Sequence, residues 1–330
     1  MKVSRRLRLA FGAAIALLFT WLVLRNVHLR DLFDAFAGAN YLWLCGAYIS
    51  FAFGYAARIE RWRSMLVAGN PQIRWRDCSG PLFAGFAVNN LFPFRVGDVL
   101  RCFAFNRTLG STSGVLIATL FIERLFDLLM VVIFFGISIR LFGIDSYGLL
   151  GIGATALLAI AALISVALLL PSLLRPTLRL FAGLLSKLSP GNRARITGEV
   201  ERSISTLEQM SGIRFFPRLF ILSAFAWFAE GLVFYMSARS LPILDSPNAA
   251  WIALPVGTLS TLIPSTPGYI GTFDYFTVHA MEISGNSAIA STAYALLVHF
   301  VLWLPPTVGG GVYLALCPPS IRDVLRRRTE

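Results

Sequence analysis

The sequence predicts an all-α polytopic membrane protein with six full transmembrane helices and two re-entrant helical hairpins, arranged as two inverted repeats. Three observations lead to this fold class: long apolar runs recur along the whole chain, two of them are broken by proline and glycine, and the order of the runs repeats. Of the 330 residues, 56% are hydrophobic and 14% are charged, and mean hydropathy is +0.70. A soluble domain of this length is less apolar, so a lipid bilayer is the expected solvent.

Six apolar runs are long enough to cross a bilayer as helices, each of which needs about 20 residues. They cover about residues 9–24, 41–57, 114–139, 148–170, 219–240 and 287–316. The first follows a basic start, as a secretory signal would, but the later runs favour a retained transmembrane helix. The longest polar stretch, 171–218, is too short for a separate domain and is expected to be either an amphipathic surface segment or a solvated connector. Residues 1–330 are therefore expected to form a single membrane domain.

Two further runs, 79–106 and 250–283, are apolar but interrupted near their middle. The interrupting residues are Pro93 and Gly97 in the first, and Pro264, Pro267, Gly268 and Gly271 in the second. If both runs are hairpins that enter and leave on one face, 22 of the 29 Lys and Arg side chains fall on the cytoplasmic side with both termini. This agrees with the positive-inside rule, which a single full crossing by either run would violate.

The order of runs is span, span, hairpin, span, and it occurs twice, in residues 1–145 and 146–330. Three crossings are an odd number, so the second repeat is expected to be inverted relative to the first. Both hairpins carry the pattern L-x-P-x-x-x-G, with Leu91 and Leu262 at corresponding positions. Interrupted segments at matching places in two inverted halves are typical of the central site of a transporter.

Charged side chains at membrane depth are costly and mark functional or paired groups. The candidate substrate-binding residues are Arg95, Asp98, Arg101, Glu123, Arg124, Asp127 and Asp274. Two interpretations stay open: a polar site in which arginines bind a lipid headgroup phosphate, or an ion-pair network that only locks the first hairpin to the span at 114–139. Asp274 and Glu230 are expected to take up a proton or to pair with a hairpin end, and Asn89 and Asn90 to bond to backbone freed at the break.

Other function classes find little support. The net charge of +12 comes from 27 Arg and 2 Lys, most of them in loops between apolar runs, so nucleic acid is not expected as a partner. The four cysteines and three histidines are scattered without the spacing of metal ligands. We therefore expect no metal, no cofactor and no enzymatic activity.

Three stretches carry a resemblance to a known family: NNLFPFRVGDVLR at 89–101, ERLFD at 123–127 and IPSTPGYIGTFD at 263–274. Together they resemble the flippase-like family of the transmembrane region of lysylphosphatidylglycerol synthase, the lipid-translocating part of the multiple peptide resistance factor. The family has Glu where this chain has Asp98 and Asp274, and a glycine where it has Tyr269, so the reach of the carboxylates and the approach to the backbone differ.

The resemblance implies a translocase that moves a lipid with an anionic or polar headgroup between the leaflets of the bacterial inner membrane. A subgroup of about this length is associated with hopanoid-related lipids. No nucleotide-binding motif is visible, so transport is expected to be passive or coupled to a proton or ion gradient. The alternatives are an ion-coupled transporter of small solutes and a membrane enzyme that acts on lipid phosphate, with Arg95, Asp98, Glu123 and Asp127 as acid, base or metal ligands.

Overall fold

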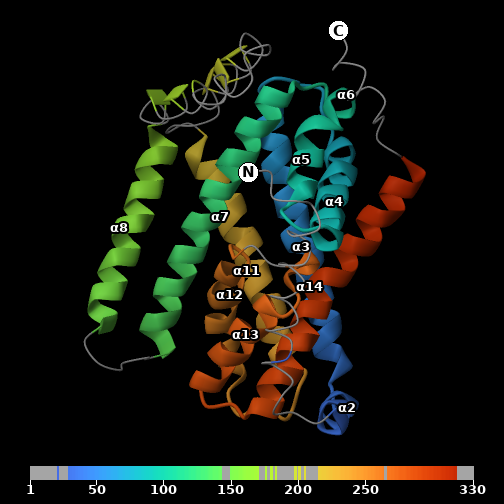
Figure 1. Cartoon of the computed structure of the whole chain (residues 1–330), viewed down its shortest axis with the longest axis vertical. Helices are drawn as coiled ribbons and strands as arrows, with labels where there is room; N and C mark the ends of the chain where they lie inside the picture. Colours follow the sequence, from blue (N-terminus) through green and yellow to red (C-terminus); the bar gives the residue numbers. More distant parts are fainter. Residues whose placement is uncertain are drawn as a thin grey trace, which may run out of the picture.

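A computed structural model of the chain describes residues 29–142, 149–170, 215–263 and 266–317, together with Trp21 and scattered positions between 175 and 205. The described elements are all helices (Figure 1). They are α2 (Leu29–Ala37), α3 (Tyr41–Leu66), α4 (Trp75–Leu91), α5 (Val96–Phe103), α6 (Asn106–Leu109), α7 (Ser113–Phe142), α8 (Leu149–Leu169), α11 (Phe216–Arg239), α12 (Ala250–Ser260), α13 (Thr272–Ile283) and α14 (Ala288–Leu316), with short 3-10 turns η3 (Pro247–Ala249) and η4 (Pro267–Tyr269).

Three described helices, α3, α11 and α14, are long and apolar enough to cross a membrane. Helices also occupy the predicted runs at 114–139 and 148–170, as α7 and α8. The predicted span at 9–24 and most of the stretch 171–218 lie outside the described residues. The chain is therefore a helical, multi-pass membrane protein, whereas six crossings and two re-entrant hairpins stay a prediction.

The first broken run folds back on itself, because α4 and α5 pack against each other. Helix α4 begins where the Asp77 carboxylate accepts hydrogen bonds from the backbone N–H (2.9 Å) and the Nε–H (3.2 Å) of Arg74. These bonds, the backbone one first, hold the pKa of Asp77 below its ordinary value. The break itself covers residues 92–95, so Gly97 lies inside α5 rather than at the interruption.

The second broken run has the same form, since α12 and α13 pack together on either side of η4. Gly268 and Gly271 have φ of +65° and +84°, a region that favours glycine, and Gly271 precedes the first residue of α13. Pro267 opens η4, whereas Pro264 lies outside the described residues. The interruption thus occurs where glycine and proline predict it.

The two helix pairs occupy opposite ends of the molecule: α4 and α5 lie in the upper half of Figure 1, and α12 and α13 in the lower half. Between them α3 packs along α11. The first helix of each pair packs against a helix of the other half of the chain: α4 against α14, and α12 against α7. The contacts of α5 with α7 likewise have a counterpart in those of α13 with α14. The two pairs therefore occupy corresponding places in the two halves of the chain.

Replacing Gly97 by alanine is expected to destabilise the protein by about 1–3 kcal/mol, the usual cost of overpacking. A Cβ at Gly97 would overlap the carbonyl oxygen of Gly85 in α4, so α5 would have to move away from its partner. Gly136→Ala is the matched control, because a Cβ there meets no atom within 4 Å. Thermal unfolding in detergent measures both variants; an equal effect at the two positions would contradict the close packing of α4 on α5.

Candidate functional site

The two breaks have unusual backbone conformations. Among the described residues, the non-glycine positions with positive φ are Phe94, Arg95 and Tyr269, at +64°, +52° and +59°. Left-handed conformations cost such residues free energy and persist only where the surrounding structure enforces them. Their concentration at the two breaks marks these segments as the candidate functional site.

The breaks touch each other through Arg95. Its Nε–H donates to the hydroxyl of Tyr269 (3.0 Å), and its Nη2 lies 3.4 Å from Oγ1 of Thr261 at the end of α12. The guanidinium also lies 6.0 Å from the centre of the Tyr269 ring. Residues from the two halves of the chain are thus joined at the centre of the bundle, with no carboxylate among the described partners of Arg95.

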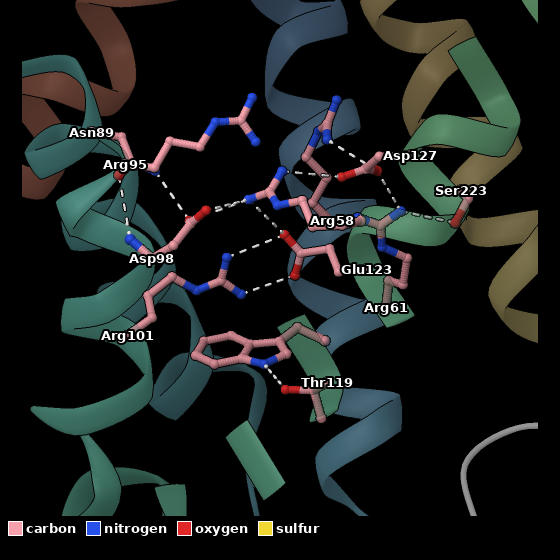
Figure 2. Close-up of polar contacts among 12 residues, drawn as sticks. Arg58, Arg61, Asn89, Arg95, Asp98, Arg101, Thr119, Glu123, Asp127 and Ser223 are labelled. Atoms are coloured by element: carbon pink, nitrogen blue, oxygen red, sulfur yellow. Dashed lines mark hydrogen bonds and ion pairs between the residues drawn. The ribbon is translucent and has the colours of Figure 1, made fainter. Parts of the chain in front are cut away.

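Arg101 and Glu123 form a buried, bidentate ion pair between α5 and α7. Nη1 and Nη2 of Arg101 donate to Oε1 and Oε2 of Glu123 at 3.1 and 2.9 Å (Figure 2). The side chains are 3% and 4% exposed, and the guanidinium lies over the Trp62 ring at 4.3 Å. Because each carboxylate oxygen accepts a hydrogen bond from Arg101, this pair joins α5 to α7.

Asp98, in the first turn of α5, contacts both α7 and the end of α4. Its carboxylate accepts from Nη2 of Arg124 (3.1 Å) and from the side-chain amide of Asn89 (3.1 Å). The amide oxygen of Asn89 in turn accepts from the backbone N–H of Asp98 (3.3 Å), which confirms that Asn89 bonds to backbone freed at the break. Asn90 instead donates to Thr307 (2.8 Å) in α14. Arg124 also reaches Asp127 at 3.5 Å, as their spacing predicts.

Two arginines, Arg58 and Arg61, were not predicted as site residues, because they follow the expected span at 41–57 and were assigned to the cytoplasmic side. Nη1 of Arg61 donates to Oδ1 of Asp127 and to the hydroxyl of Ser223, both at 2.9 Å (Figure 2), and the Arg61 side chain is 1% exposed. Arg58 pairs with Glu230 of α11 and lies 3.8 Å from Asp127. The predicted span stopped at residue 57, whereas α3 continues to Leu66. The three-residue spacing of Arg58 and Arg61 on one unbroken helix was the available signal.

A cavity of about 480 Å³ lies where these elements meet. Arginine and carboxylate side chains line one part of it, among them Arg58, Arg95, Arg124, Asp127 and Glu230. Most of the other lining side chains are aromatic or aliphatic, together with a few polar ones such as Asn89, Thr261 and His299. Amphipathic lining of this kind suits a ligand that has a charged group and an apolar part.

The predicted site residues therefore divide into three groups. Arg95, Arg124 and Asp127 line the cavity. Asp98, Arg101 and Glu123 lie behind it in the ion-pair network, and Asp274 is buried in α13 against His299. In residues 29–142, 149–170, 215–263 and 266–317, no three His, Cys, Asp or Glu side chains form a cluster that could hold a metal ion.

Comparison with known proteins identifies the family to which this chain belongs. The family model of the lysylphosphatidylglycerol synthase TM region matches residues 9–310, which include all three motif stretches and both breaks. The chain belongs to this family. The ion-pair network and the paired breaks are thus features of a member of the lysylphosphatidylglycerol synthase TM region family.

Two relatives are similar over most of this chain at low identity. The protein named glycosyltransferase AglD of Haloferax volcanii is 22% identical over 94% of this chain and 54% of its own length. The UPF0104 membrane protein MJ1078 of Methanocaldococcus jannaschii is 24% identical over 71% of this chain and 95% of its own length. The chain thus spans about half the length of the first relative.

Proposed function

We propose that the protein is a lipid translocase, which moves a lipid with an anionic headgroup between the leaflets of the bacterial inner membrane. Arg95 carries the proposal. It lines the central cavity and its described partners are uncharged hydroxyl groups, whereas the neighbouring Arg58, Arg61, Arg101 and Arg124 are paired with carboxylates. A headgroup phosphate would supply the negatively charged partner that Arg95 lacks.

The surface near Arg95 suits acyl chains. Phe92 and Phe94 are 54% and 59% exposed. Leu262, which lines the cavity, is 61% exposed. Exposed apolar side chains at membrane depth face lipid, so a headgroup in the cavity could keep its tails in the hydrocarbon. Figure 2 shows that the guanidinium of Arg95 points away from the carboxylates of Asp98 and Glu123, which supports its proposed role as the headgroup contact.

The inverted repeat is part of the proposal. Matching contacts of α4 with α14 and of α12 with α7 support two related halves, whose hairpins enter from opposite faces. Rocking of one half against the other would expose the cavity to each leaflet in turn. The termini are proposed to be cytoplasmic, from the distribution of Lys and Arg.

Glycosyl transfer is not proposed, because the name of the Haloferax relative describes a protein of which nearly half has no counterpart in this match. Instead, the proposal is tested by reconstituting the whole chain in liposomes with fluorescent phosphatidylglycerol and quenching the outer leaflet. We expect the inner-leaflet label to become accessible much faster than in protein-free liposomes. Folded protein that accelerates exchange of neither phosphatidylglycerol nor an isoprenoid phosphate would refute translocation.

A further inference from the structure

His299 in α14 lies between two hydrogen-bond acceptors of the second hairpin. Its Nδ1 is 2.6 Å from Oδ1 of Asp274, and its Nε2 is 2.8 Å from the carbonyl oxygen of Gly268. The remaining carboxylate oxygen of Asp274 accepts the backbone N–H of Gly271 (2.8 Å). The His299 and Asp274 side chains are 15% and 6% exposed, so water satisfies little of either group.

This geometry determines how many protons the pair holds. A backbone carbonyl only accepts hydrogen bonds, so Nε2 must carry a proton. A proton must also lie between Nδ1 and the Asp274 oxygen for these atoms to approach within hydrogen-bond distance. The pair therefore holds one proton more than a neutral imidazole beside an ionised carboxylate, whichever of the two groups carries it.

Loss of that proton would separate His299 from Gly268. If the remaining N–H stays with Asp274, the lone pair of Nε2 faces the lone pairs of the Gly268 carbonyl and repels them. A second donor is close by: the indole Nε1 of Trp303 is buried without a described partner, and a Cβ on Gly268 would lie 2.9 Å from it. A second N–H group without a described partner therefore lies beside Gly268.

The segment that would move also carries Tyr269, the residue that holds Arg95. Gly268 and Tyr269 are adjacent, and both have positive φ. While His299 donates to Gly268, the Tyr269 hydroxyl accepts from Nε of Arg95. Movement of Gly268 would withdraw that hydroxyl and leave the guanidinium of Arg95 free to bind an anion.

The other carboxylates on the cavity wall already have arginine partners. Besides Tyr269, the titratable groups on the remaining walls are Tyr55, Arg58, Arg95, Arg124, Asp127 and Glu230. Arginine stays protonated in proteins, and Glu230 and Asp127 each have an arginine partner. The extra proton on the His299–Asp274 pair is therefore the labile charge that borders the second break.

We propose that His299 and Asp274 form a proton-binding site whose proton holds Gly268 in place and keeps Tyr269 on Arg95. Release of the proton through the cavity frees Arg95 to bind a phosphate, so proton and anion oppose each other by linkage. The anion part rests on the proposed function, whereas the proton site stands on the contacts of His299 alone. The proton would then be the coupling ion of translocation.

The test is nitrogen-15 NMR of histidine-labelled full-length protein in phosphatidylcholine nanodiscs between about pH 5.5 and 8.5, where imidazoles titrate. His299→Gln assigns the signals, and His279→Gln, at an exposed histidine of α13, is its control. We expect His299 to carry protons on both nitrogens at low pH. Its ratio of doubly to singly protonated form at fixed pH should fall at least about twofold in Tyr269→Phe, as linkage requires.

Tyr41→Phe, at an exposed tyrosine remote from the cavity, should leave the ratio unchanged. Added phosphatidylglycerol should lower the ratio in the wild type and leave it unchanged in Arg95→Ala. Nitrogen signals of His299 that do not change over this pH range, or a ratio insensitive to Tyr269→Phe, would overturn the proton site. Because these measurements need no leaflet exchange, a failure of the exchange assay refutes translocation separately.

Discussion

Replacing Arg95 by alanine is expected to reduce leaflet exchange of phosphatidylglycerol to the rate of protein-free liposomes. Charge-assisted hydrogen bonds contribute about 1.5–3 kcal/mol each. Loss of a bidentate contact with phosphate therefore corresponds to a decrease of at least about 100-fold in the exchange rate. Arg95→Lys keeps the charge but not the planar fork, and should retain part of the activity. Stability should change little, because the partners of Arg95 are two partly buried hydroxyl groups.

Arg239→Ala is the matched control for this variant. Arg239 lies in the last turn of α11 over the Trp43 ring and does not line the cavity. Its loss should leave exchange near the wild-type rate. Normal exchange by folded Arg95→Ala would contradict the assignment of the headgroup site, whereas equal losses in both variants would point to a general effect of removing positive charge.

Replacing Glu123 by alanine is expected to destabilise the protein by about 3–5 kcal/mol, the usual cost of leaving one charge of a buried ion pair without its partner. The guanidinium of Arg101 would remain buried against Trp62 after its two carboxylate bonds were lost. Thermal unfolding in detergent measures the effect. Glu60→Ala should cost no more than about 1 kcal/mol, since the Glu60 side chain is 27% exposed and water still reaches its pairs with Arg63 and Arg218.

The double variant Arg101→Met with Glu123→Met separates the two interpretations of the network. Apolar side chains of similar volume often replace a buried ion pair at little cost, so the double variant should regain most of the stability lost in Glu123→Ala. If Glu123 only locks α5 to α7, exchange should recover too. Stable double-variant protein without exchange would show that this pair also serves the substrate.

Much of the site could be predicted because breaks and buried charges leave local signals. Proline and glycine at residues 93 and 268 interrupt long apolar runs, and a charge such as Glu123 within such a run is expensive unless paired. The family resemblance in the three motif stretches drew on the same residues. These features belong to single helices, so the sequence displays them directly.

Pairing between helices could not be predicted in this way. Arg58 and Arg61 were predicted to lie outside the membrane, because their hydrophilicity matches a cytoplasmic loop. His299 has no other histidine or cysteine near it in the sequence, so it was expected to be an isolated residue. The structure brings Arg61 to Asp127 and His299 to Asp274 across helices that are far apart in the chain. Such contacts depend on how α3, α7, α13 and α14 pack.

The sequence by itself determined that the chain is a helical membrane protein, where its two runs break and which charges within its apolar runs must find partners. Hydrophobicity and backbone geometry act over neighbouring residues, which explains this success. Only the tertiary structure decided which partner each charge found. It also decided that Arg95 faces hydroxyl groups, whereas Arg58, Arg61, Arg101 and Arg124 face carboxylates. An ion pair depends on distances of a few ångströms between helices, and those distances are set by packing.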